Sequence, residues 1–431
     1  MKTIKLYISI AMVLIAYASC TTKQSETITN AKDYESFFNT TNQTAIKNTQ
    51  TKIKFWNSKI KEDSLQILAL RSVAKEYEHL FSITGDIDYV LKSEQALKKS
   101  SEVAAIDKEN YLLTLAQNYI TQHQFQKADS VAKAAYEVNN NNISKMVLFD
   151  IAMELGKYKE AKEYLAAIQN PSDYNFLIRL AKWEDYKGNL DSTIRNMEKA
   201  RAIAESGNKK NLKLWVYTNL ADYYGHAGRI EDSYHYYLKA LEIDSGNTYA
   251  MKGIAWIVYS FEKNPKEALR IVDAIMERTS NPDLYLFKAE LAEYMGDQKQ
   301  KEINLNLFLS KVANPAYGVM YHQHLATVLA EEYQSYSEAL DYMQLELQNR
   351  PTPMTYDLMA YILHLKGEHP EALKIAMTHV KGQTYEPTAL LHLAQIYKSN
   401  QLKDEMSKLV SELKESSYEL GPVTSTIVAQ L

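Results

Sequence analysis

The stretch Leu214–Gly246, LWVYTNLADYYGHAGRIEDSYHYYLKALEIDSG, decides the fold. Its first half places four residues at positions i, i+3, i+4 and i+7, on one face of an α-helix: Tyr217, Leu220, Ala221 and Tyr224. Gly228 then interrupts the pattern, because glycine favours the end of a helix. The second half repeats the helical spacing with another set: Ser233, Tyr237 and Ala240. The stretch therefore predicts two short helices joined by a tight turn.

The same plan recurs along the chain. Met354–Val380, MTYDLMAYILHLKGEHPEALKIAMTHV, has a helical apolar face, then Gly367, then a second helical face. The residue that opens the second face recurs ten times: Val90, Ala128, Ala161, Thr193, Ser233, Ala268, Lys301, Ala339, Ala372 and Met406. The shortest step, from Ala161 to Thr193, is 32 residues, and the longest, from Thr193 to Ser233, is 40. A period of this size indicates a helical repeat protein.

This pattern resembles the tetratricopeptide repeat (TPR) over roughly 350 of the 431 residues. A small residue recurs in the first helix, helix A: Ala116, Ala181, Ala221, Ala289, Ala360 and Ala394. A glycine recurs in the turn: Gly85, Gly156, Gly188, Gly228, Gly296 and Gly367. The resemblance implies an all-α fold, a right-handed α-solenoid of about ten TPR-like helix-turn-helix repeats, with a concave wall formed by the A helices.

Three residues depart from the repeat pattern. Lys301, Glu346 and His379 occupy positions that are usually apolar or small. Large polar side chains hold two helices apart where they cross closely. We therefore expect looser packing around the seventh to ninth repeats, and a local functional use is the other interpretation.

The N-terminus predicts export and a lipid anchor. Two lysines precede the apolar run Leu6–Ala18, which is too short to span a bilayer but typical of a signal peptide. The sequence Tyr17-Ala18-Ser19-Cys20 resembles the lipobox of bacterial lipoproteins, although Tyr17 replaces the usual leucine. The resemblance implies acylation of Cys20, the only cysteine, and a location in the bacterial cell envelope, at the outer membrane on its periplasmic or surface face.

Three segments are predicted from this pattern. Residues 1–19 are the lipoprotein signal peptide, and residues 20–50, rich in Thr, Asn, Gln and Ser, are a flexible tether. Docking of Tyr34–Phe38 on the folded body is the other interpretation of that part of the tether. Residues 51–425 form the solenoid with its C-terminal cap, and the apolar tail GPVTSTIVAQL (421–431) is expected to cap the final repeat.

The composition and the absence of known catalytic motifs argue against an enzymatic function. The 49 basic and 53 acidic residues give a net charge of −4 with no basic cluster, which argues against nucleic-acid binding. The sequence has no HExxH, no GxSxG and no glycine-rich phosphate loop. The only close histidine pair, His322 and His324, points to different sides of a helix. We expect no catalytic residue, no bound metal and no small-molecule cofactor.

The concave wall is the candidate site for binding a peptide or protein. The predicted inward-facing residues combine carboxylates with aromatic rings, which suits an extended peptide with basic and apolar side chains. They are Asp150, Lys182, Tyr186, Asp222, His226, Phe261, Glu290, Tyr294 and Tyr361. A second candidate patch is the outer face of the fifth repeat, where spacing turns Tyr234 and Tyr236 outward.

Three functions fit these observations in different degrees. The first is a non-catalytic scaffold for protein–protein interaction, anchored to the membrane by lipid. The second is glycan capture, because SusD-like surface lipoproteins also combine a lipidated cysteine with TPR-type helices, although they insert long loops that this chain lacks. The third, an all-α glycosidase or lyase, needs paired carboxylates on loops at one rim, and the short turns predicted here argue against it.

Overall fold

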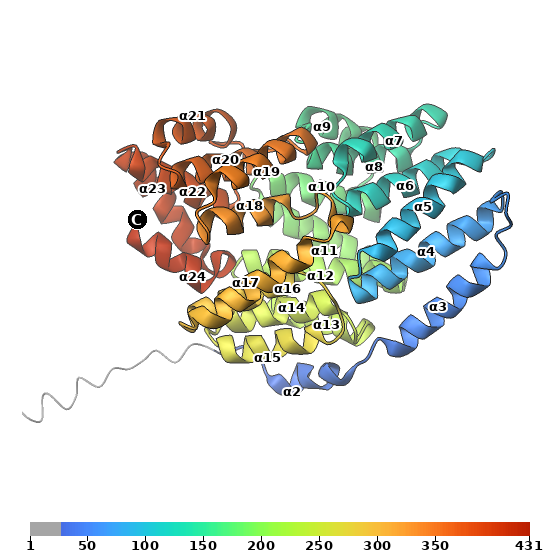
Figure 1. Cartoon of the computed structure of the whole chain (residues 1–431), viewed down its shortest axis with the longest axis horizontal. Helices are drawn as coiled ribbons and strands as arrows, with labels where there is room; N and C mark the ends of the chain where they lie inside the picture. The colour runs from blue at the N-terminus through green and yellow to red at the C-terminus, as the bar shows by residue number, and fades with distance from the viewer. Residues whose placement is uncertain (1–26) are drawn as a thin grey trace, which may run out of the picture.

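The computed structural model describes residues 27–431, and within that range the chain is helical with no β-strand (Figure 1). Consecutive helices pack in antiparallel pairs, and the pairs stack into a right-handed α-solenoid of TPR-like repeats. The predicted fold class is therefore confirmed. The predicted signal peptide and Cys20 lie outside the described residues.

Ten hairpins make up the solenoid, and we number them as repeats 1–10, each with a helix A and a helix B. Repeats 1–5 are α4 (Ile67–Thr84) with α5 (Asp88–Val103), α6 (Lys108–Thr121) with α7 (Phe125–Val138), α8 (Asn142–Glu154) with α9 (Tyr158–Ala167), α10 (Tyr174–Tyr186) with α11 (Leu190–Ser206), and α12 (Lys210–His226) with α13 (Ile230–Ile243).

Repeats 6–10 follow the same order. They are α14 (Thr248–Trp256), extended by the π-helical turn η2 (Ile257–Phe261), with α15 (Pro265–Met276), α16 (Asp283–Tyr294) with α17 (Gln298–Val312), α18 (His322–Glu331) with α19 (Tyr336–Asn349), α20 (Pro353–Leu365) with α21 (His369–His379), and α22 (Pro387–Ser399) with α23 (Lys403–Glu415). A short 3₁₀ turn, η3 (Pro315–Tyr317), lies between repeats 7 and 8.

The small residues identified in the sequence lie where the two helices of a repeat cross. All six helix A alanines are buried, and so are nine of the ten residues that open the helix B face, Met406 being partly exposed. In repeat 4 the crossing is close enough for the Thr193 hydroxyl to donate to the backbone carbonyl of Ala181 at 3.2 Å. A larger side chain at either position would separate the helices.

Every hairpin turn contains one residue in the left-handed region. Six are the predicted glycines, with φ between +67° and +92°. In the other four hairpins a non-glycine residue takes the same conformation: His123, Lys263, Gln334 and Gln401. The turn geometry is therefore constant, and the sequence satisfies it with glycine in only six repeats.

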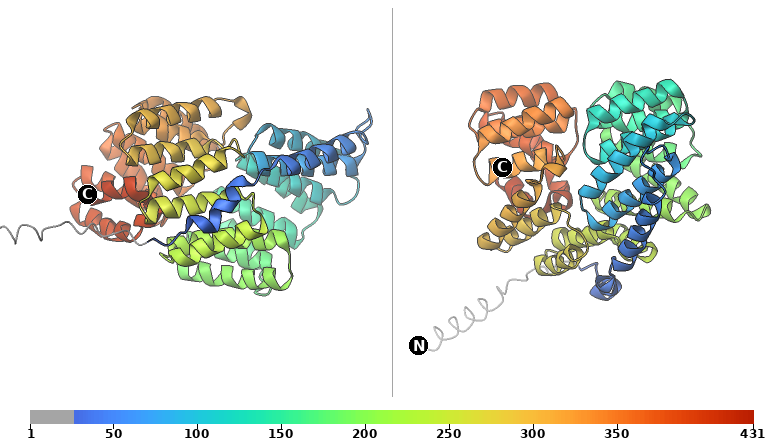
Figure 2. Two further views of the ribbon diagram at one scale, coloured as in Figure 1. Left: turned by 90° about the horizontal axis from the view of Figure 1, so that it is seen from below. Right: turned by 45° about the vertical axis from the view of Figure 1, so that its right-hand side comes forward.

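The solenoid curves until early and late repeats touch (Figures 1 and 2). The backbone N–H of Ser280, between repeats 6 and 7, donates to the carbonyl of Thr84 in repeat 1 at 2.8 Å. The side chain of Asn349, at the end of repeat 8, donates to the carbonyl of His123 in repeat 2 at 2.7 Å. The ring of Tyr385, before repeat 10, lies against Gly188 in repeat 4. One turn of the superhelix thus packs on the next.

Two of the three departures from the repeat pattern, Lys301 and Glu346, form buried ion pairs. For these two the prediction of looser packing is wrong. Lys301 is 8% exposed, and its ammonium group lies 3.0 Å from Glu293 and 2.8 Å from Glu332. Glu346 is buried and pairs with Arg350 one helical turn later. His379 is half-buried and stacks on the ring of Tyr356, with centroids 3.9 Å apart.

The described part of the predicted tether is folded, which corrects that prediction for residues 27–50. Helix α2 (Ala31–Tyr34), the 3₁₀ turn η1 (Glu35–Asn39) and α3 (Gln43–Asn57) lie along the solenoid (Figure 1). Tyr34 is 1% exposed, and its hydroxyl donates to Glu267 of repeat 6 at 2.7 Å. Tyr34, Phe37 and Phe38 pack against the core of the middle repeats, and this apolar contact holds a segment that is otherwise polar.

The same N-terminal segment removes the predicted outer patch. Tyr234 is buried, and its hydroxyl lies 3.2 Å from the backbone of Asn30 and from the carboxylate of Asp33. Tyr236 is buried as well, between Tyr217 and Tyr224. Neither ring is free for self-association.

The C-terminal helix α24 (Ser417–Gln430) does more than cap the last repeat. Leu420 and Val428 pack against Leu391 and Leu413 of repeat 10, as predicted for a cap. The start of α24 also contacts α12, η2 and α16, which belong to repeats 5–7. No helix in residues 27–431 is both long and apolar enough to cross a membrane.

The turn geometry gives a matched prediction in two neighbouring repeats. Gln334→Gly removes a side chain from an exposed residue at φ +53°, so we expect the free energy of unfolding to rise by about 0.5–1 kcal/mol. Gly367→Ala adds a Cβ at φ +92°, and no atom lies within 4 Å of that Cβ. Backbone strain alone should therefore lower the free energy of unfolding by about 1 kcal/mol. Denaturant unfolding of the two variants measures both changes.

Gly207→Ala is the control, because Gly207 has an ordinary φ of −81°. It should leave the midpoint of unfolding nearly unchanged. Equal destabilisation by the Gly207 and Gly367 variants would contradict the assigned turn conformation.

Candidate functional site

The nine predicted site residues all belong to first helices of repeats, the element that the sequence places on the concave wall. Asp150 lies on α8, Lys182 and Tyr186 on α10, and Asp222 and His226 on α12. Phe261 ends η2, Glu290 and Tyr294 lie on α16, and Tyr361 lies on α20. Two cavities on this wall gather four of the nine.

The larger cavity, of about 580 Å³, lies between helices of repeats 2–5. It brings together Asp150, Lys182 and Gln117, which helical spacing also turns inward. It adds residues that the sequence did not reveal: Ile120, Ile178, Arg179, Asp185, Met197, Trp215, Asn219 and Tyr223. Its charges are paired between adjacent repeats. Arg179 donates to Asp150 at 2.5 Å, and Lys182 donates to Glu154 at 2.8 Å.

The ion pairs determine how these charges behave. Burial works against the charge of Lys182, but Glu154 and Asp150 outweigh it and hold the pKa of that ammonium above its ordinary value. Asp185 forms no ion pair with any residue in the range 27–431, and burial together with Glu386 raises its pKa to about 6. Most charged groups of this cavity are therefore held in ion pairs. Asp185 is the acidic group of this cavity that protonates most easily.

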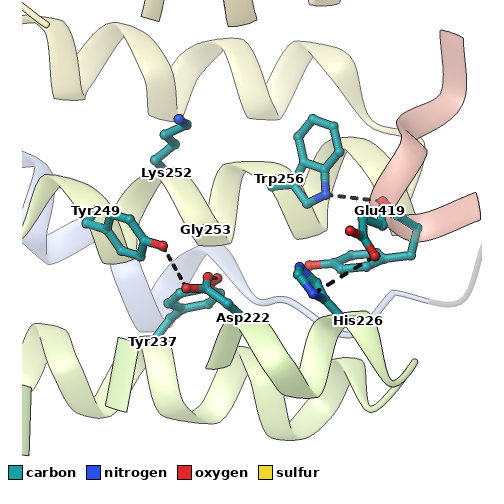
Figure 3. Close-up of a pocket in the computed structure, with 9 residues that line it drawn as sticks. Asp222, His226, Tyr237, Tyr249, Lys252, Gly253, Trp256 and Glu419 are labelled. Carbon is teal, nitrogen blue, oxygen red and sulfur yellow. Dashed lines mark hydrogen bonds and ion pairs between the residues drawn. The ribbon is translucent and has the colours of Figure 1, made fainter. Parts of the chain in front are cut away.

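The smaller cavity, of about 250 Å³, lies between α12, α14 and the start of α24 (Figure 3). Asp222 accepts hydrogen bonds from the hydroxyl groups of Tyr237 and of Tyr249, the latter at 2.6 Å. These bonds favour the carboxylate, but burial outweighs them and raises the pKa of Asp222. His226, one helical turn further along α12, has its Nδ1 3.9 Å from Glu419 of the C-terminal segment.

The remaining predicted residues line neither of these cavities. Tyr186 stacks on Tyr158, with ring centroids 3.9 Å apart. Tyr361 is buried and stacks on His392 at 3.7 Å, so its ring packs between repeats 9 and 10 and is not presented to a ligand. Tyr294 keeps 37% of its surface exposed and contacts the ring of Tyr259 edge-on.

Phe261 was placed by α-helical spacing, and the π-helical turn changes that register. In η2 each turn holds more residues than in an α-helix, so the side chains rotate relative to the pattern. Phe261 is half-buried against the core, whereas Tyr249, Lys252 and Trp256 of α14 face the smaller cavity. The sequence shows no signal for this turn.

Other missed residues were within reach of the sequence pattern. Trp215, Asn219, Asp222 and His226 are spaced by four, three and four residues, which is a single stripe on α12. Extending the predicted stripe by two turns would have found Trp215 and Asn219. Glu419, by contrast, reaches the site through a contact that spans about half of the chain, and local spacing carries no trace of it.

Glu290 lies near Trp256 of the smaller cavity, and burial raises its pKa strongly. Its carboxyl group accepts a hydrogen bond from the Tyr259 hydroxyl at 2.9 Å. Burial, with a smaller contribution from Glu293, raises its pKa from 4.5 to about 7. Among the described residues, no group of three or more His, Cys, Asp or Glu side chains is arranged to hold a metal ion.

The comparisons with known proteins identify no family for this chain. No protein-family model matches the chain, and no curated protein matches it. Among solved structures, a tetratricopeptide repeat protein from Parabacteroides merdae is similar at 15% identity and a TM-score of 0.39, over 56% of this chain and 93% of that one. The Pseudomonas aeruginosa protein pilF is similar at 14% identity and a TM-score of 0.36, over 48% and 94%.

Human IFIT1, solved as a dimer with PPP-AAAA, is similar at 14% identity and a TM-score of 0.42, over 86% of each chain. At these identities and scores, no partner or activity of those proteins transfers to this chain. The repeat fold rests on the ten hairpins themselves.

The raised pKa of Glu290 gives a pH dependence of stability. Below about pH 7 the folded state keeps this carboxyl protonated, whereas in the unfolded chain it ionises near pH 4.5. The folded state then binds more protons, so the free energy of unfolding falls as the pH rises from 4.5 through 7. Between pH 5 and pH 8 we expect the free energy of unfolding of the wild type to fall by about 2–3 kcal/mol more than that of Glu290→Gln.

Urea unfolding at a series of pH values measures this difference. Glu338→Gln, which changes an exposed carboxyl on α19, is the control. If the wild type and the Glu290 variant lose stability in parallel, the carboxyl is not protonated in the folded protein.

Proposed function

We propose that the chain is a non-catalytic interaction scaffold of the bacterial cell envelope, lipid-anchored at Cys20, whose concave face binds an extended segment of a partner protein. The observation that carries the proposal is the row of two cavities along the first helices of successive repeats. A row of side-chain-sized cavities suits an extended chain, whose successive side chains enter neighbouring hollows.

Exposed aromatic rings support this function. Trp215 in the larger cavity is 43% exposed, and Tyr249 in the smaller cavity is 55% exposed. Tryptophan and tyrosine supply large contact area at a small entropic cost and dominate the binding energy of many interfaces. Rings that the core does not use are therefore available for a partner.

The lining of the two cavities supports a binding role over catalysis. Within the described residues, neither lining includes a serine, threonine or cysteine that could act as a nucleophile. Asp150, Lys182 and Arg179 are committed to ion pairs between repeats. Glycan capture could use the same rings, but the solenoid has no long loops with which to surround a sugar.

Photo-crosslinking tests the concave face directly. A photoreactive phenylalanine analogue at Asn219, which lines the larger cavity, should crosslink to a discrete protein in intact cells of the native host. The same analogue at His235, exposed on helix B of the same repeat, should give no such product. Equal crosslinking from both positions would contradict the proposed interaction. Glycans bound to the protein without any crosslinked protein would contradict it as well.

Cys20→Ala tests the anchor. Loss of the acylated thiol should move the protein from the membrane fraction to the soluble fraction, because no described helix replaces the anchor. Thr22→Ala, two residues away, should leave the protein in the membrane fraction. A Cys20 variant that stays fully in the membrane fraction would disprove lipidation as the means of attachment.

A further inference from the structure

The C-terminal segment is held on the concave wall by directed contacts. The backbone carbonyl of Tyr418 accepts hydrogen bonds from Trp256 Nε1 at 3.2 Å and from the Ser260 hydroxyl at 2.6 Å. Both donors belong to repeat 6, whereas Tyr418 follows repeat 10. Two donors on one carbonyl fix the position of the residues on either side of it.

Glycines on both sides of this contact leave room for the segment. A Cβ at Gly225, on α12, would lie 2.7 Å from the ring of Tyr418, closer than side chains approach. Gly421, at φ +77°, would place a Cβ 3.0 Å from both Trp256 and Glu290. A glycine within a helix costs about 1 kcal/mol relative to alanine, and the docked tyrosine accounts for its presence at position 225.

The docked segment supplies one wall of the smaller cavity. Figure 3 shows Asp222 and His226 rising from α12, Tyr249 and Trp256 from α14, and Glu419 entering from the C-terminal segment. The two carboxylates come from different parts of the chain and face the same space. Lys252 lies on the side of the cavity opposite Asp222 (Figure 3).

The size and lining of the cavity indicate what would enter it. Pockets for whole cofactors occupy about 300–1,000 Å³, so a cavity of about 250 Å³ is on the scale of one side chain. Tryptophan is the ring that attracts a cation most strongly, and a carboxylate forms charge-assisted hydrogen bonds with guanidinium or ammonium groups. Asp185 and Glu386, which interact electrostatically with Glu419 and with His226, add two further acidic groups nearby.

We propose that this cavity binds the cationic end of a basic side chain, arginine or lysine, from the partner segment. The cation would lie between the carboxylates of Asp222 and Glu419 and against the ring of Trp256. The C-terminal segment must be docked for the site to be complete, because it contributes Glu419. The proposal rests on the proposed function and names the side chain that this part of the concave face recognises.

Burial of the two carboxyls is consistent with such a ligand. Burial raises the pKa of Asp222, and burial with Asp185 raises the pKa of Glu419 to about 7. Without a cation, each carboxylate is therefore held in a site that disfavours its charge. A bound guanidinium would add to the favourable charge that Lys252 already supplies to Asp222.

A peptide pair tests the charge requirement on the full-length protein. The probe is Ac-Ala-Leu-Arg-Leu-Ala-NH2, and its control replaces arginine with citrulline, which keeps the shape and removes the charge. We expect the arginine peptide to bind at least tenfold more tightly by isothermal titration. Equal affinities would overturn the proposal.

Matched variants test the residues. Asp222→Asn and Glu419→Gln should each weaken binding of the arginine peptide at least fivefold and leave the citrulline peptide unchanged. Glu415→Gln, an exposed carboxyl at the end of α23, should change neither affinity. Gly225→Leu, which displaces Tyr418 and with it Glu419, should match the Glu419 variant. Circular dichroism and the unfolding midpoint show whether each variant is folded.

Two outcomes separate this proposal from the proposed function. If the Asn219 crosslink persists in cells while the Glu415 and Glu419 variants bind the arginine peptide alike, the basic-side-chain site is wrong and the scaffold function stands. If no protein crosslinks at Asn219, the scaffold function itself fails, whatever the peptides do.

Discussion

The fold depends on the close crossing of two helices within each repeat. A small side chain on the first helix meets the residue that opens the face of the second, and in repeat 4 the gap is closed by a hydrogen bond from Thr193 to the Ala181 carbonyl. One hairpin crossing in this way still leaves an apolar face open, so it must stack on its neighbours. Ten stacked hairpins that share one turn conformation form the curved wall (Figure 2).

The curvature of the stack alone would give an open spiral. Contacts between early and late repeats close this spiral. Turns of repeats 1, 2 and 4 pack against segments that border repeats 6 to 10. The N-terminal segment covers repeats 5 and 6 from outside through Tyr34, and the C-terminal segment lines the concave wall of repeats 5–7. Both ends of the described chain thus converge on the middle repeats. The smaller cavity lies there and takes one of its walls from the C-terminal end.

Local rules allow much of this to be predicted from the sequence. The ladder, the helix A alanines and the turn glycines follow from spacing and side-chain size, and the structure confirms them. The inner stripe on α12 follows from helical periodicity, whereas the π-helical turn η2 shifts the register on the next repeat and misplaces Phe261. Lys301 was misjudged and Glu419 was missed because their partners lie on another repeat or far away in the sequence. The aromatic residues Tyr34–Phe38 indicate a docking segment, but neither its partner in repeat 6 nor the helices of residues 27–50 follow from local spacing.

The central claim is that the hairpins form one curved stack whose successive turns touch. Gln126 and Gln348 test it most directly, because both are exposed, they are 222 residues apart, and the Gln126 amide lies 3.4 Å from the Gln348 carbonyl. Cysteines at these two positions, in a chain with Cys20 replaced, can carry spin labels. Pulsed electron paramagnetic resonance then measures the distance between the two labels. A closed superhelix predicts a single, narrow distribution at short distance. A broad distribution at long distance would show that the turns do not meet, and the account of the concave site would fail with them.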